Sequence, residues 1–132
     1  MIDLATVRRA ADAALSRAAE LGLSVSVIVC DDRGHEVFGC RGDGASWQTV
    51  EIARAKAQTA ASFGRDSAAL GTMREKWPDV FAIANDALPF RATSLAGGLV
   101  VIRDGRTLAA IGVSGALPDQ DVEIAEAARV LL

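Results

Sequence analysis

The sequence predicts one α/β sandwich domain over residues 1–132, of the α+β kind, in which helices flank an antiparallel sheet. Two observations support this fold class. The strand-like stretches come in two pairs, and each pair is joined by a short turn rather than by the helical crossover that parallel strands need. Helix-like stretches with apolar residues at helical spacing lie before, between and after these pairs. A chain of 132 residues is also long enough to bury a hydrophobic core.

The first elements expected are a helix and a hairpin. Asp3 can cap a helix that Gly22 ends. The stretch LSVSVIVCDDRGHEVFGCR then predicts two strands around a turn at residues 31–34. Cys30 and Cys40 lie on these strands and could face each other across the hairpin. In a reducing compartment we expect two free, buried thiols rather than a disulfide.

The middle of the chain is expected to be helical and then irregular. Ser46 can cap a long helix over residues 47–63, and Asp66 can cap a shorter helix that Pro78 stops. Residues 78–98 form the least regular region of the sequence.

A second hairpin and a final helix close the chain. In LVVIRDGRTLAAIGVS, the pair Asp104-Gly105 is the strongest turn signal of the sequence. Pro118 suits the first turn of the last helix, where its missing N–H costs no hydrogen bond. The glycine turn before that helix is not expected to bind phosphate. Acidic residues such as Asp121 crowd the helix N-terminus, and residues 107–128 contain no Lys or Arg.

The composition argues against several classes of protein. The net charge is −3 and the basic residues are scattered, so the chain lacks the basic stripe of a nucleic-acid-binding protein. No apolar run approaches membrane-spanning length, and the N-terminal stretch has no secretory signal, so we expect a cytoplasmic protein without membrane contact. Two cysteines and one histidine make no zinc signature, and no metal site is expected.

Several stretches resemble the GlcG/HbpS-like (DUF336) family, which includes the C-terminal domain of PduO-type proteins. The first hairpin, VSVIVCDDRGHEVFGCRGDGA, is similar to the family's VSIAVVD--G-LVAF-RMDGA. The stretch VEIARAKAQTAASFGR is similar to its IEIARAKA-TA helix, and GRTLAAIGVSGALPDQDVEIAEAA to its C-terminal signature. GGLVVI corresponds to its G-G-V-P-I but lacks the proline. The resemblance covers nearly the whole chain.

The resemblance implies a profilin-like or Roadblock-like sandwich with a five-stranded antiparallel sheet, and it implies a homo-oligomer. It also implies a protein that binds a small ligand, with haem or another tetrapyrrole as the leading candidate and haem as the cofactor to test. The segment LPFRATSLA departs from the glycine- and proline-rich loop common in the family. A ligand other than that of a typical member would follow if this loop shapes the site.

Candidate ligand-binding residues lie in the first hairpin, the long helix and the segment before the second hairpin. Haem iron takes His, Met, Cys or Tyr ligands, and His35 is the single histidine, although a solvated turn residue is the alternative. Arg91 can bind a carboxylate near the pair Gly97-Gly98, and Arg54, together with Lys56, can be an electrostatic partner of a small acidic or carbonyl substrate held there. Gly97 and Gly98 either let a ligand approach the backbone or only permit a positive φ before a strand.

An enzyme on the same scaffold is the alternative function. If Lys56 is buried, its pKa falls and it can act as a base or a Schiff-base amine, with carboxylates from Glu51 and Asp121. Such an enzyme would carry out lyase- or isomerase-type chemistry on a small carboxylated or carbonyl metabolite. Alternatively, Lys56 packs its aliphatic stem under a solvated amine. A third reading is an accessory subunit that packs on another protein.

Overall fold

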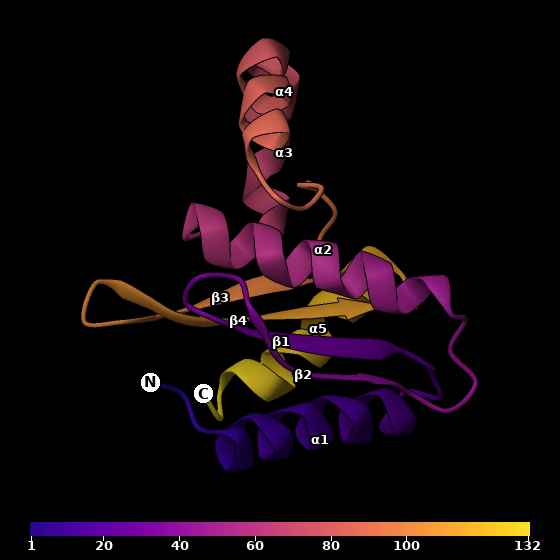
Figure 1. The fold of residues 1–132 in the computed structure, drawn as a ribbon. Coiled ribbons are helices and arrows are strands. Elements are labelled where there is room, and N and C mark those ends of the chain that lie inside the picture. Colours follow the sequence, from indigo (N-terminus) through magenta and orange to yellow (C-terminus); the bar gives the residue numbers. More distant parts are fainter.

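The computed structural model describes residues 1–132 and shows a four-stranded antiparallel sheet between two layers of helices (Figure 1). The α+β class and the antiparallel sheet flanked by helices are confirmed. In chain order the elements are α1 (Leu4–Glu20), β1 (Ser26–Asp31), β2 (Glu36–Arg41), α2 (Gln48–Phe63), the 3-10 helix η1 (Ser67–Ala69), α3 (Leu70–Lys76), α4 (Pro78–Ala87), β3 (Gly98–Arg103), β4 (Arg106–Ser114) and α5 (Pro118–Arg129).

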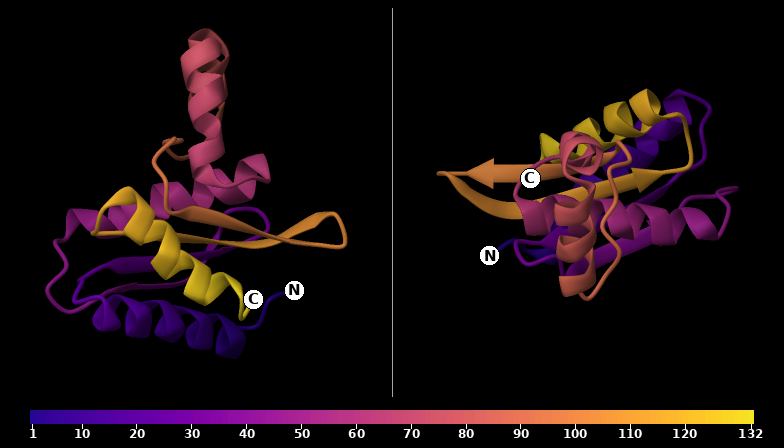
Figure 2. Two further views of the ribbon diagram at one scale, coloured as in Figure 1. Left: turned by 180° about the vertical axis from the view of Figure 1, so that it is seen from behind. Right: turned by 90° about the horizontal axis from the view of Figure 1, so that it is seen from above.

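The two hairpins lie side by side in the sheet, in the strand order β2-β1-β4-β3. The central pair is antiparallel, with Val27 of β1 opposite Val113 of β4. Helix α2 packs on one face of the sheet, and α1 and α5 pack on the other (Figures 1 and 2). Helices α3 and α4 stand on α2 and project away from the sheet, and the two chain termini lie near each other (Figure 1).

The five-stranded sheet that the family resemblance implies is wrong for this chain, which forms four strands. The segment before β3 forms no strand, and side chains of helices bind its backbone. The Ala92 N–H donates to Asn85 Oδ1 at 2.8 Å, and the Thr93 N–H donates to Thr59 Oγ1 at 3.1 Å. These bonds hold the segment against α4 and α2, away from pairing with a strand, and the sheet consists of the two hairpins.

The proline that ends α3 also begins the next helix. Pro78 is the first residue of α4, where a missing N–H leaves no bond unmade. The prediction that residues 78–98 are irregular is therefore wrong for the ten residues of α4. Asp66 does precede η1, but its side chain makes no capping bond there. Its Oδ1 instead accepts from the Val100 N–H at 3.0 Å and from Arg129 at 3.1 Å.

The pairing of β1 with β2 separates the two cysteines. Cys40 lies opposite Val27, whereas Cys30 lies opposite Glu36 after a register shift. Both thiols are free, as expected, with Cys30 buried and Cys40 half-buried. They do not face each other across the hairpin, because Cys30 packs towards Ala53 of α2 while Cys40 packs on the α1 side.

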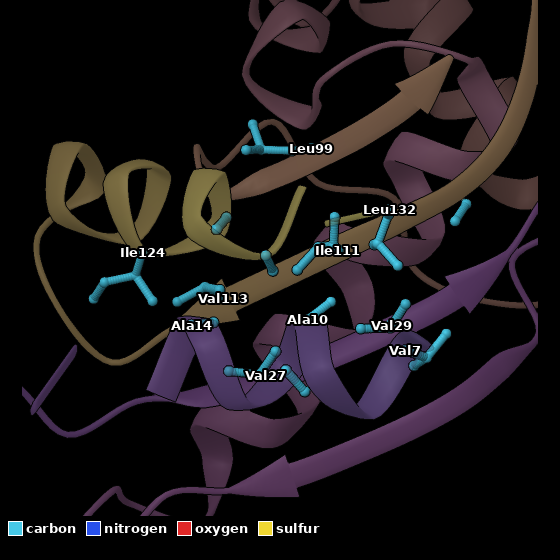
Figure 3. Packing of buried hydrophobic residues seen from close by; sticks show 14 of the residues in the cluster. Val7, Ala10, Ala14, Val27, Val29, Leu99, Ile111, Val113, Ile124 and Leu132 are labelled. Atoms are coloured by element: carbon cyan, nitrogen blue, oxygen red, sulfur yellow. The ribbon is translucent and has the colours of Figure 1, made fainter. Parts of the chain in front are cut away.

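The main core fills the space between the sheet, α1 and α5 (Figure 3). Small side chains also let α2 approach the sheet closely on the other face. Ala53 and Ala57 are fully buried there, and a Cβ added at Gly112 would overlap the Ala53 carbonyl oxygen. None of the helices combines the length and the apolar character needed to cross a membrane.

Candidate functional site

A groove of about 780 Å³ lies where α3, α4 and the segment before β3 meet α2. This volume falls within the ~300–1,000 Å³ typical of small-molecule sites. The groove has apolar and aromatic walls with several arginines, and its lining residues are Glu51, Ile52, Arg54, Ala55, Gln58, Arg74, Phe81, Asn85, Phe90, Arg91, Ala92, Thr93 and Leu95.

The walls of the groove are fixed by a small core of their own. Phe81 and Ala92 are buried and pack with Leu70, which joins α3, α4 and the segment before β3. The bonds from Ala92 to Asn85 and from Thr93 to Thr59 tie the same segment to α4 and α2. The groove is therefore built by three helices and by residues 88–97, which form no helix or strand but are held against α4 and α2 by these bonds.

Arg54 is held at the groove by two carboxylates. Its Nε donates to Glu36 Oε2 at 2.8 Å, and its Nη1 donates to Glu51 Oε1 at 2.7 Å. The hydrogen bonds to Glu36 and then to Glu51 raise the pKa of the Arg54 guanidinium above its ordinary value. The charge of Arg54 is thus already neutralised by protein groups.

The other two arginines of the groove have no carboxylate within ion-pair distance. Arg74 Nη1 donates to Ser94 Oγ at 3.3 Å, and its guanidinium carbon lies 5.9 Å from the centre of the Phe81 ring. That placement is typical of a cation–π contact. Arg91 is exposed and makes neither a hydrogen bond nor an ion pair. The groove therefore presents two unpaired positive charges.

Lys56 and Asp121 meet in the interior of the protein and not at the groove. Lys56 Nζ donates to Val113 O at 2.8 Å and to Asp121 Oδ2 at 3.0 Å, and both side chains are 4% exposed. Asp121 Oδ1 also accepts from the Ala116 N–H at 3.0 Å. Burial raises the pKa of the Asp121 carboxyl, an effect that the Lys56 ammonium opposes.

The glycine pair packs against the same ion pair. Gly97 has a φ of +115°, and a Cβ there would lie 2.7 Å from Val113 O and 3.0 Å from Lys56 Nζ. A Cβ at Gly98 would overlap the Lys56 carbonyl oxygen. This geometry favours close packing as the role of both glycines, and no cavity of the protein is lined by Lys56 or Asp121. Their catalytic role stays a prediction.

The predicted site residues thus fall into three separate places. Lys56 and Asp121 form the buried pair, while Glu51 lies at the groove, bound to Arg54. His35 lies in the turn between β1 and β2, where its side chain is 77% exposed and its Nδ1 is 3.5 Å from Asp31 Oδ2. It does not line the groove.

Arg74 is the groove residue that sequence reasoning missed. It belongs to α3, whereas Phe81 belongs to α4, and Pro78 separates the two helices. Helical spacing does not carry across such a break, so no local pattern shows that Arg74 and Phe81 share a wall. The contact of Arg74 with Ser94 is likewise between segments distant in the sequence.

A sequence profile described as "Haem degrading protein HbpS-like" matches residues 2–129. The chain belongs to the HbpS-like family. It is 36% identical to Protein GlcG of Escherichia coli K12 over 91 residues, which are 69% of this chain and 64% of GlcG. It is 28% identical to the corrinoid adenosyltransferase PduO of Salmonella typhimurium, over 88% of this chain and 34% of PduO. The chain thus spans less than two thirds of either relative.

Solved structures of HbpS-like proteins share the fold. A double mutant of Streptomyces reticuli HbpS is 35% identical, with a TM-score of 0.88, and the match covers 99% of this chain and 86% of that one. The structure of a PduOC:haem complex is 26% identical, with a TM-score of 0.87, and the match covers 99% of this chain and 94% of that one. At least one relative of this fold therefore binds haem.

Proposed function

We propose that this HbpS-like protein binds haem or a related tetrapyrrole in the groove between α2, α4 and the segment before β3. The observation that carries the proposal is a groove with aromatic walls and two guanidiniums that no carboxylate neutralises. A porphyrin is flat and apolar over most of its surface, and its carboxylates are the natural partners of such guanidiniums. The haem complex of PduOC and the family's description support the same ligand class.

The residues of the groove fit one part of haem and not another. Ile52, Phe81 and Phe90 offer apolar surface to a macrocycle, and Arg74 and Arg91 offer charge to propionates. No His, Cys, Met or Tyr side chain lines the groove, so its residues hold no axial ligand for the iron. Binding at the groove would rest on the ring and its carboxylates.

Two other predictions compete with this proposal. His35 could bind haem iron at the first hairpin turn, outside the groove. Lys56 could serve an enzyme, but its amine is bound to Val113 O and Asp121 in the interior and lines no cavity, which supports a structural ion pair. The solvated amine expected as the alternative role of Lys56 is wrong, because this side chain is buried. The homo-oligomer and the accessory-subunit reading stay predictions that do not change the test of the groove.

The test is a haemin titration of the purified protein, followed by the Soret absorbance. Arg74→Ala and Arg91→Ala are each expected to weaken binding by about tenfold, the value of one lost charge-assisted hydrogen bond. Arg65→Ala is the matched control, because this exposed arginine follows α2 and makes no side-chain contact at the groove. Unchanged affinity in both groove variants, with binding lost in His35→Ala, would place the ligand at the turn and refute the proposal.

A further inference from the structure

We infer that the groove recognises a planar ring with two carboxylates and is indifferent to the metal at the centre of the ring. This inference rests on the proposed function and deepens it, because it states which chemical groups of the ligand the groove contacts. Three features of the groove lead to it: the number of unpaired guanidiniums, the nature of its walls and the places of the possible metal ligands.

The available positive charge of the groove amounts to two guanidiniums. Three arginines line the groove, but Arg54 is bonded to Glu36 and Glu51 and has little left to offer a ligand. Arg74 is oriented by Ser94 and by the Phe81 ring, with no carboxylate near it. Arg91 makes no polar side-chain contact within the chain. Two carboxylates on one ligand would satisfy Arg74 and Arg91.

Glu51 limits where the carboxylates of a ligand can bind in the groove. Its carboxylate lies at the groove and is shared with Arg54, so a ligand carboxylate placed there would meet a like charge. Negative groups of a ligand are therefore directed towards Arg74 and Arg91, and its uncharged surface towards Ile52 and the aromatic walls.

The side chains that could bind iron all lie elsewhere. Cys30 is fully buried beneath α2, and Cys40 packs on the α1 side of the sheet. Met73 packs into the small core with Leu70 and does not line the groove. His35 is in the exposed turn between β1 and β2. Removing the metal from the ligand consequently removes no contact that the groove provides.

The experiment compares three probes on the wild-type protein: haemin, metal-free protoporphyrin IX and protoporphyrin IX dimethyl ester. Binding is followed by the absorbance of haemin and the fluorescence of the two metal-free porphyrins. We expect the dissociation constants of haemin and protoporphyrin IX to agree within about threefold. The dimethyl ester should bind at least about tenfold more weakly, because esterification removes both carboxylate charges.

Variants test whether Arg74 and Arg91 cause the preference for protoporphyrin IX over its dimethyl ester. In the double variant Arg74→Ala/Arg91→Ala, the acid and the ester should bind equally weakly, whereas Arg65→Ala should discriminate as the wild type does. Binding of haemin without binding of protoporphyrin IX would overturn the inference and leave the proposed function standing. Equal binding of acid and ester by the wild type would also overturn it. If neither haemin nor protoporphyrin IX binds, the proposed function itself fails.

Discussion

Lys56 Nζ lies 3.0 Å from Asp121 Oδ2 in the interior, where it joins α2 to α5. The same ammonium donates to the carbonyl oxygen of Val113, so β4 is part of the junction. A buried ion pair of this kind is costly to break, because removal of one partner leaves the other charge without compensation. It does not by itself make a protein more stable than an apolar pair would.

Loss of either partner should therefore destabilise the fold strongly. We expect Lys56→Met and Asp121→Asn each to lower the free energy of unfolding by about 3–5 kcal/mol, and the double variant to lose less than the sum. Urea unfolding measures all three. Lys76→Met is the matched control, because Lys76 is exposed on α3. Strictly additive losses would contradict the coupling of the two side chains.

The loss in Lys56→Met should also depend on pH. Burial raises the pKa of Asp121, and without Lys56 nothing cationic opposes that effect. A raised pKa in the folded state means that stability is highest at low pH and is lost as the pH rises through that pKa. The difference in the free energy of unfolding between the wild type and Lys56→Met should therefore become smaller as the pH falls. A gap that widens towards acid would show that Asp121 is not the group left uncompensated.

Gly97 is predicted to be intolerant of alanine for two reasons. Its φ of +115° is strained for any residue with a Cβ, and that Cβ would approach Val113 O and Lys56 Nζ. Gly22→Ala is the control for strain alone, since its φ is +70° and nothing lies within 4 Å of the added Cβ. We expect Gly22→Ala to lower the free energy of unfolding, measured in urea, by about 1–2 kcal/mol, and Gly97→Ala to lower it by more. Equal losses would refute a packing role for Gly97.

The sequence predicts both hairpins, their turns and the helices other than α4, because each of these has a local signal. Asp104 and Gly105 both have positive φ, at 53° and 74°, as the two-residue turn predicted from this pair requires. Pro118 begins α5 as expected. Pro78 ends one predicted helix, but a proline is equally suited to begin a helix, and the sequence prediction therefore lacks α4.

The site is harder to predict, because it depends on contacts between distant segments. Arg54 and Arg91 were predicted as ligand-binding residues and both line the groove. Arg74 was missed, since its place beside Phe81 and Ser94 is decided by the packing of α3 and α4. The ion pair of Lys56 with Asp121 has no local sequence signal either, because the two residues are 65 positions apart.

The two thiols should differ in their reactivity. Burial raises the pKa of Cys30 to about 12, so almost none of it is thiolate near neutral pH. Burial also raises the pKa of Cys40, but this side chain is only half-buried. With Ellman's reagent at pH 8, the folded Cys30→Ser variant, which keeps Cys40, should react slowly. The Cys40→Ser variant, which keeps Cys30, should not react while folded and should react only after urea unfolds it. Rapid reaction of native Cys40→Ser would contradict the buried position of Cys30.

The location of bound haemin tests the central claim most directly. Ferric haem broadens the NMR signals of nearby amides, so a ¹⁵N-labelled sample with one equivalent of haemin reports where the ligand lies. We predict selective loss of the signals of residues 90–95 and of Ile52 and Ala55 on α2, while the signals of α1, on the opposite face of the sheet, remain sharp. Loss confined to the turn around His35, with the groove signals unchanged, would contradict the assignment of the groove as the ligand site.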